Sequence, residues 1–341
     1  MTTSFFSRAA ILLAVCIGFD AAPAGAQTSG ARAATPPATE ESRRALTDYA
    51  YLLMVKRDVV TAMARYFDAK LIQHDAEIGD SGHGDEEFLS NRRKENPQQF
   101  LATEQYHTVV DNLLADGDLI AVKSHVYTNP RDPGRVFVDI WHVVGGSFVE
   151  HWDVVQPVPA APLNDATSWC GGASNWADAD KVGDTVARPG CGLSGPAANR
   201  DAALATVAAY TGMAEDPRKA AEAVERYFAD DFVQHGPDVA QGKAALVAYE
   251  RSHADARVAQ RWKLAIARTI ADGNLVLTHG RITTSADARG VARVDLYRVQ
   301  SGKIVEHWDV VQPIPAFSLA GHSMVDGPLE PSRTVGTRAG P

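Results

Sequence analysis

The stretch EHWDVVQPVP at residues 150–159 recurs as EHWDVVQPIP at residues 306–315, with one difference in ten positions. The two copies are 306 − 150 = 156 residues apart. Solenoid repeats have periods of about 20–50 residues, so this spacing is far too long for one. We therefore expect two copies of a complete domain in this 341-residue chain.

Three further pairs of matching segments lie upstream of these copies. They are LADGDL (114–119) with IADGNL (270–275), VDIWHV (138–143) with VDLYRV (294–299), and RYFDAKLIQH (65–74) with RYFADDFVQH (226–235). The last pair has an offset of 226 − 65 = 161, so the repeats differ in length by five residues before their strands. The predicted organisation is a signal peptide (1–26), leader (27–44), domain 1 (45–160), linker (161–199), domain 2 (200–316) and tail (317–341).

Each repeat places helical patterns before strand patterns. Apolar spacing predicts helices over 42–57 and 57–69 in the first repeat, and over 241–253 in the second. Asp216 and Pro217 predict a helix start, with Asp as the N-cap. Strands are expected over 262–270, 275–284, 292–300 and 303–312, joined by the tight turns Asp272-Gly273 and Ser301-Gly302. This order predicts an α+β fold, with helices on a curved, mostly antiparallel sheet.

The first 26 residues are typical of a secretory signal peptide, with Arg8, an apolar run from Ala9 to Phe19, and an Ala-Gly-Ala cleavage triplet. A buried core helix fits the basic flank and the triplet less well. Cleavage near Ala26 would give a secreted or periplasmic protein without a membrane segment. It would also remove Cys16 and leave Cys170 and Cys191, which an oxidising compartment would join in a disulfide rather than leave as two free thiols.

Charge and composition exclude some partners and cofactors. The net charge of −9 argues against a nucleic-acid surface. The sequence has no phosphate-binding glycine loop and no cofactor fingerprint, so no cofactor is expected. His74, His125, His151 and Asp153 are acceptable metal ligands, but they lack tight ligand spacing, and no metal is predicted.

Strand alternation predicts which polar residues share a face. His151 and Asp153 lie on one face of their strand, as do His307 and Asp309 in the second copy. Two ionisable groups are costly in a dry core, so this face is expected to line a polar cavity rather than the protein core; a simply solvent-exposed face is the alternative. Asp139 and Asp295 lie between apolar residues of the preceding strand. We expect their side chains to line the same cavity.

These motifs resemble SnoaL-like proteins of the nuclear transport factor 2 superfamily. GKIVEHWDVVQPIP (302–315) and HSMVDG (322–327) are most similar to the SnoaL-like aldol-condensation branch. The resemblance implies cone-shaped domains, each with a pocket enclosed by its sheet. It implies no single reaction, because the fold hosts isomerases, cyclases, dehydratases and non-catalytic binders. Such domains commonly pair through their sheets, so an intramolecular pseudo-dimer is expected.

The resemblance also implies roles for individual residues. In the related ketosteroid isomerases, an acid at the position of Asp139 and Asp295 is held protonated and donates a hydrogen bond to an oxyanion, which implies raised pKa values here. His74 and His235 stand where that family has its general-base carboxylate. The strand where the SnoaL-like branch has His-x-His carries the remaining expected pocket residues, which are Lys123, His125, His279 and Arg281.

The expected function is cofactor-free acid–base chemistry on a small hydrophobic carbonyl compound, such as aldol-type cyclisation, isomerisation or dehydration. His235 or His307 would abstract a proton with help from Asp309, and Asp295 would stabilise the enolate. His74, Asp139, His151 and Asp153 are the equivalent set in domain 1. The alternative is a periplasmic protein that binds a small molecule in the same pockets without catalysis.

Overall fold

The computed structural model describes residues 40–52, 56, 58–80, 107–127, 131, 133–159, 161–164 and 197–325. The signal peptide, Cys170 and Cys191 lie outside these residues. The first repeat contains helices α1 (Glu40–Ala50) and α2 (Val59–Tyr66), and strands β1 (Phe67–Gln73), β2 (His107–Asp116), β3 (Leu119–Tyr127), β4 (Arg135–Val144) and β5 (Ser147–Pro157).

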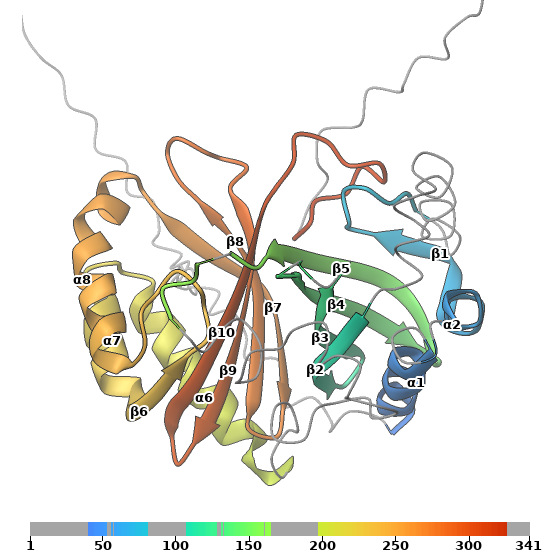
Figure 1. Ribbon diagram of the computed structural model, residues 1–341, viewed down its shortest axis with the longest axis horizontal. Coiled ribbons are helices and arrows are strands. Elements are labelled where there is room, and N and C mark those ends of the chain that lie inside the picture. Colours follow the sequence, from blue (N-terminus) through green and yellow to red (C-terminus); the bar gives the residue numbers. More distant parts are fainter. Residues whose placement is uncertain are drawn as a thin grey trace, which may run out of the picture. The chain divides into compact units, whose positions relative to one another are not determined.

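The second repeat has the same order of strands, with a helix between its first and second strands, as the colours of Figure 1 show from yellow to red. It contains the short helix η2 (Ala197–Asn199), helices α6 (Arg200–Ala214), α7 (Ala220–Tyr227) and α8 (Lys243–Ala259), and strands β6 (Phe228–Gln234), β7 (Lys263–Asp272), β8 (Leu275–Thr283), β9 (Val291–Gln300) and β10 (Lys303–Pro313). The α+β class is confirmed.

Each repeat builds a five-stranded sheet with the same topology. The orders are β1-β5-β4-β3-β2 and β6-β10-β9-β8-β7. All neighbours are antiparallel except β1 with β5 and β6 with β10, which are parallel. The hairpin turns form at the predicted places, and Gly273 (φ 56°) and Ser301 (φ 50°) adopt the left-handed backbone that such tight turns need.

Several expected helix boundaries are wrong. The helix predicted over 42–57 ends at Ala50, and the helix predicted over 241–253 continues to Ala259. The helix predicted over 57–69 ends at Tyr66, because Phe67 begins a strand that pairs with Phe148 of β5. In the second repeat, α7 begins at Ala220 and not at Pro217. The Asp216 carboxylate accepts the Arg218 N–H at 3.0 Å, and its carbonyl accepts the Lys219 N–H at 2.8 Å, so these residues form a turn before the helix.

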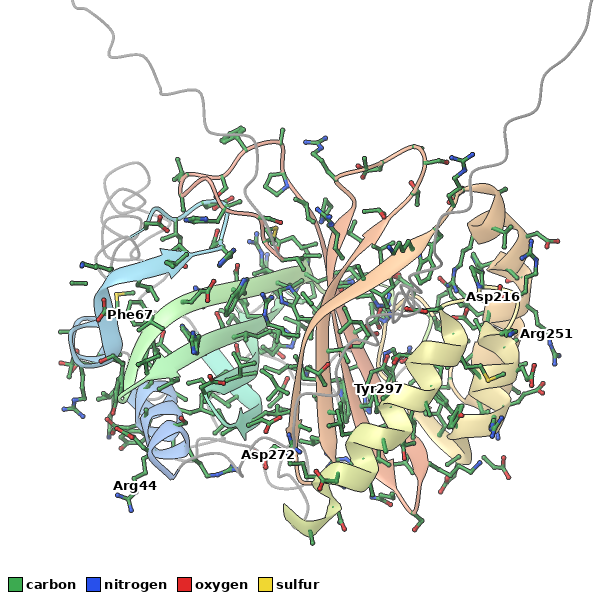
Figure 2. All side chains as sticks on the ribbon, turned by 180° about the vertical axis from the view of Figure 1, so that it is seen from behind. Arg44, Phe67, Asp216, Arg251, Asp272 and Tyr297 are labelled. Carbon is green, nitrogen blue, oxygen red and sulfur yellow. The ribbon has the colours of Figure 1, made fainter. Side chains whose placement is uncertain are left out.

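The two faces of each sheet have different neighbours. On the face that we call the helix face, Trp141 packs with Leu46 of α1 in the first repeat, and Tyr297 packs with Val207 of α6 in the second. Figure 2 labels Tyr297 beside α6. The opposite face is called the shared face, because side chains of both sheets form one buried cluster there: among others Ile140, Trp152, Val154, Leu296, Trp308 and Val310.

Reciprocal hydrogen bonds link the two repeats. The Gln312 Oε1 atom accepts the Val155 N–H at 2.7 Å, and the Gln156 Oε1 atom accepts the Val311 N–H at 2.8 Å. The four residues form two pairs at the 156-residue offset. Each repeat therefore donates one of these hydrogen bonds and accepts the equivalent one. Such self-complementary pairing is the pattern of a twofold interface, here between the halves of one chain.

Candidate functional site

A histidine and two aspartates meet on the helix face of the second repeat. The register of β9 and β10 places Asp295 directly opposite Asp309. His307 lies two residue pairs along, on the same face; its Nε2 atom is 2.8 Å from Asp295 Oδ1, and its ring stacks on Tyr297 at 4.9 Å between centroids. The structure therefore brings Asp295, His307 and Asp309 together as one cluster, of which His307 and Asp295 are buried.

The first repeat builds the same cluster at equivalent positions. Asp139 pairs with Asp153 across β4 and β5. His151 Nε2 lies 3.4 Å from Asp139 Oδ1, and the His151 ring stacks on Trp141 at 5.0 Å. The Asp139 side chain is 18% exposed, whereas that of Asp295 is 4% exposed. The carboxylate of the first cluster is thus the more accessible of the two.

A buried glutamine orients each histidine. The Gln73 Oε1 atom lies 2.8 Å from His151 Nδ1, and the Gln234 Oε1 atom lies 3.1 Å from His307 Nδ1. Gln234 Oε1 also accepts the Gly236 N–H at 3.0 Å, so the amide oxygen faces the ring and His307 Nδ1 is the donor. This leaves Nε2 directed at Asp295. In both Gln-His pairs the glutamine, and not the expected base His74 or His235, is the residue that reaches the cluster.

His74 and His235 lie on the shared face, away from these clusters. The ring of His74 stacks on Trp152 at 4.8 Å, and the ring of His235 stacks on Trp308 at 4.5 Å. Their Nε2 atoms approach Glu150 at 2.8 Å and Glu306 at 3.5 Å. Successive strand residues point to opposite faces, so Gln and His in the same Gln-His pair cannot both reach the cluster. The structure thus separates the two histidines from the proposed reacting groups.

The four other expected pocket residues also lie apart from the clusters. Ala121 and Leu277 belong to the shared face, and alternation puts Lys123, His125, His279 and Arg281 on that same face. Lys123 forms a fully buried ion pair with Asp111 (2.7 Å), and His125 Nε2 lies 2.9 Å from the Pro133 carbonyl. His279 contacts Arg268 at 2.6 Å; burial and this cation hold the His279 pKa well below its usual value.

Arg293 is a member of the second cluster that the sequence analysis missed. Its Nε atom lies 2.9 Å and 3.0 Å from the two Asp295 carboxylate oxygens, and its NH2 atom lies 3.4 Å from Asp309 Oδ2. A signal was available, because Arg293 stands two residues before Asp295 and therefore on the same strand face.

The protonated Asp295 implied by the resemblance is corrected by this contact. Burial by itself raises the pKa of the Asp295 carboxyl. The Arg293 charge and the hydrogen bonds from His307 and Arg293 outweigh burial, and the net pKa of Asp295 lies below its usual value of 3.8. Asp295 is therefore ionised at neutral pH and accepts hydrogen bonds there.

Asp75 adds a third carboxylate to the first cluster. It is half-buried, its Oδ1 atom accepts the Glu77 N–H at 2.6 Å, and it interacts electrostatically with His151, Glu77 and Asp139. Burial raises its pKa, and the negative charges of Glu77 and Asp139 add to the effect, whereas the Glu77 N–H and His151 oppose it. A carboxyl with a raised pKa next to a histidine is suited to accept and return a proton.

Neither a metal site nor a membrane helix is found in the described residues. No three His, Cys, Asp or Glu side chains are placed there to hold a metal ion. No helix among them is long and apolar enough to cross a membrane.

The second repeat matches a known domain family. The family model of the SnoaL-like domain matches residues 204–307, which include Asp295 and His307. No curated protein sequence matches the chain.

Solved structures with a similar fold cover about a third of the chain each. An NTF2-like protein of unknown function from Mesorhizobium loti is 17% identical over 35% of this chain and 99% of its own, with a TM-score of 0.30. IdmH from Streptomyces antibioticus, named as a polyketide cyclase, is 17% identical over 32% and 91%, with a TM-score of 0.27. A Kribbella flavida protein named as a ketosteroid isomerase is 17% identical over 33% and 80%, with a TM-score of 0.29. On the family match, the second repeat of this chain, from residue 204 to residue 307, is a SnoaL-like domain.

Proposed function

We propose that the protein is a cofactor-free acid–base enzyme that moves a proton next to the carbonyl group of a small hydrophobic compound. Isomerisation, aldol-type cyclisation and dehydration all begin with this step. A carboxylate or a histidine nitrogen takes the proton, and the electron pair of the C–H bond passes into an enolate. A neighbouring donor then stabilises the enolate oxygen.

The observation that carries the proposal is the cluster itself, built twice at equivalent positions. Each copy has a histidine held by a glutamine on one side and approached by an aspartate on the other, with His151 6% and His307 7% exposed. Buried ionisable groups destabilise a fold unless they are paired, and perturbed groups cluster at functional sites. The Trp141 and Tyr297 rings against the histidines give the apolar surroundings that a hydrophobic compound requires.

Incorporation of solvent deuterium next to a carbonyl group tests the proposal without knowledge of the product. We expect the protein in deuterated buffer to exchange α-hydrogens in a panel of apolar ketones, as followed by NMR. Replacing both cluster histidines (His151→Gln with His307→Gln) should slow exchange by about 100-fold or more. The matched control is His253→Gln on the exposed surface of α8, whose ring contacts only Tyr249 and Ser252 among the contacts resolved for it. Exchange that survives the double replacement would contradict the acid–base role.

Non-catalytic binding is the second candidate function, and it uses the same residues. The buried, glutamine-held histidines would then donate hydrogen bonds to a carbonyl ligand without removing a proton. The same panel distinguishes the two functions: ketone-dependent shifts of the His151 or His307 ring signals without deuterium incorporation favour a binder.

The proposal also includes export and pairing of the two domains. Cleavage after Ala26 would make Gln27 the N-terminal residue of protein purified from its host, which N-terminal sequencing tests. A non-reducing mass measurement should find no free thiol if Cys170 and Cys191 form a disulfide.

The reciprocal Gln156 and Gln312 contacts support an intramolecular pseudo-dimer. Sedimentation of the mature chain as a monomer with both domains folded is the expected result.

A further inference from the structure

Besides the ring that stacks on the histidine, which is Trp141 in one and Tyr297 in the other, the two clusters differ at two equivalent positions that change the charge. At the 156-residue offset, Arg293 of the second repeat corresponds to Phe137 of the first, and both lie two residues before the cluster aspartate. At the 161-residue offset, Gly236 corresponds to Asp75. The first repeat therefore has one more carboxylate, and an uncharged ring where the second repeat has a guanidinium.

Arg293 makes the second cluster unsuited to proton transfer. Its guanidinium contacts Asp295 at 2.7 Å and Asp309 at 3.4 Å, and His307 adds a further contact to Asp295 at 2.8 Å. A carboxylate held by a guanidinium in this geometry is a poor base, because a proton would have to displace a charge-assisted bidentate contact. The Asp295 side chain is also only 4% exposed, which leaves little surface for a ligand atom.

Gly236 leaves no room for a third carboxylate in the second repeat. A Cβ atom at Gly236 would lie 1.9 Å from Asp309 Oδ1 and 3.4 Å from Gln234 Oε1. An aspartate like Asp75 could enter only if Asp309 moved away from its place beside Arg293. One cluster therefore cannot hold both an aspartate at the position of Asp75 and Gly236, and an ion pair like that of Arg293 with Asp309.

The segment that follows β10 of the second repeat holds the residues on both sides of Asp75. The Leu319 N–H donates to the Ala76 carbonyl at 3.0 Å, and His74 Nδ1 donates to the Ser323 carbonyl at 2.5 Å. The segment is anchored by Met324, which is fully buried in the shared cluster. The tail that follows domain 2 therefore positions the backbone that carries Asp75.

We infer that the two domains have different roles: domain 1 performs the proton transfer, with Asp75 as the proton-accepting group beside His151, and domain 2 is a non-reacting partner whose C-terminal tail positions Asp75. The inference rests on the proposed function. In the step, the Asp75 carboxylate forms an O–H bond with the substrate α-proton, and the C–H electron pair passes to the enolate. The proton on Asp75 exchanges with solvent, and a solvent-derived proton then returns from Asp75 to carbon, so no oxidant or co-reactant is needed.

The test transfers the domain 2 arrangement into domain 1 and leaves domain 2 unchanged. Phe137→Arg places a guanidinium beside Asp139 and Asp153, and Asp75→Asn removes the accepting carboxylate. Each single change should lower α-deuterium exchange of the whole chain by about 100-fold. Val144→Arg is the matched control, because it adds the same guanidinium to β4 at an exposed position (Val144 is 56% exposed), and it should retain wild-type exchange. If domain 2 also reacted at a comparable rate, each variant would keep about half of the activity, and this result would overturn the inference.

Titration of the wild-type carboxyl groups gives a readout that does not depend on activity or on a variant that folds. The side-chain carboxyl carbon of Asp75, followed by NMR, should titrate above 3.8, and that of Asp295 below 3.8. The groups that interact with Asp75 are His151, Glu77 and Asp139, so the titration is recorded together with theirs. Equal titration of Asp75 and Asp295 would overturn the inference. A wild-type protein that exchanges no ketone would contradict the proposed function instead, and the titration would still decide between equal and divided domains.

Discussion

Asp116 and Asp272 occupy equivalent positions in the two repeats, and each carboxylate binds the backbone of the other repeat. Asp116 Oδ2 accepts the Ala271 N–H at 3.0 Å, and Asp272 Oδ2 accepts the Ala115 N–H at 3.1 Å. Each aspartate closes the ADG turn of its own repeat, as Figure 2 shows for Asp272 at the end of its strand. Each aspartate is thus the last residue of its strand, and its carboxylate also links the two repeats.

Removal of either carboxylate should lower the free energy of unfolding by a similar amount. Arg200 contacts Asp116 at 2.9 Å, and Arg43 contacts Asp272 at 2.9 Å, so each replacement leaves a buried N–H and an arginine without this acceptor. We expect Asp116→Ala and Asp272→Ala each to lower the free energy of unfolding by about 1–3 kcal/mol, as measured by urea denaturation.

Asp230→Ala is the matched control for these two variants. Asp230 is fully exposed and pairs with Lys243 on the surface, so its loss should leave the urea midpoint unchanged. A midpoint that drops equally in all three variants would show that the effect does not come from the contacts between the repeats.

Replacement of Arg293 should destabilise domain 2 strongly. Arg293→Met leaves the buried Asp295 and the half-buried Asp309 as neighbouring carboxylates without their cation, which costs about 3–5 kcal/mol of unfolding free energy. Adding Asp309→Asn removes one of the two charges and should restore part of the loss. In the exposed Arg251–Glu225 pair, Arg251→Met should cost about 0.5 kcal/mol or less. Equal costs at the two arginines would contradict the buried ion pair.

Acid should reveal the Asp295 contact. The pKa of Asp295 is lower in the folded protein than the usual 3.8, so the unfolded chain binds the proton more readily. The stability that this carboxylate contributes is therefore complete above about pH 4 and is lost as the pH falls through the folded pKa. Urea midpoints from about pH 5 to about pH 3 should fall more steeply for the wild type than for Asp295→Asn. Parallel curves would refute this linkage.

A methyl group at Gly236 should be poorly tolerated. The added Cβ of Gly236→Ala would lie 1.9 Å from Asp309 Oδ1, so the carboxylate must move away from Arg293, at a cost of about 1–3 kcal/mol. Gly212 lies inside α6 with no atom within 4 Å of an added Cβ, so Gly212→Ala should stabilise the helix by about 0.5–1 kcal/mol. Opposite signs in thermal denaturation are the expected result, and a neutral Gly236→Ala would contradict the crowding.

The 156-residue repeat by itself predicted two copies of one domain, and the order of helical and strand patterns in each copy predicted the α+β class and the tight turns at Gly273 and Ser301. It also determined that His307 and Asp309 share a face, because strand alternation is a local property of the backbone. The strand at Phe67 escaped prediction, since its pairing with β5 joins residues far apart in the sequence.

Only the tertiary structure decided which way each alternating set points. Alternation puts Gln234 and His235 on opposite faces of the strand but does not determine which of them lies on the helix face. The packing of one face against α6 and of the other against the second sheet places the glutamine on the helix face. The ionised state of Asp295 depends on Arg293 and His307, which converge through strand geometry and cross-strand register. The sequence therefore determined the faces of each strand, whereas the register and packing between elements determined the neighbours, and with them the charge of each group.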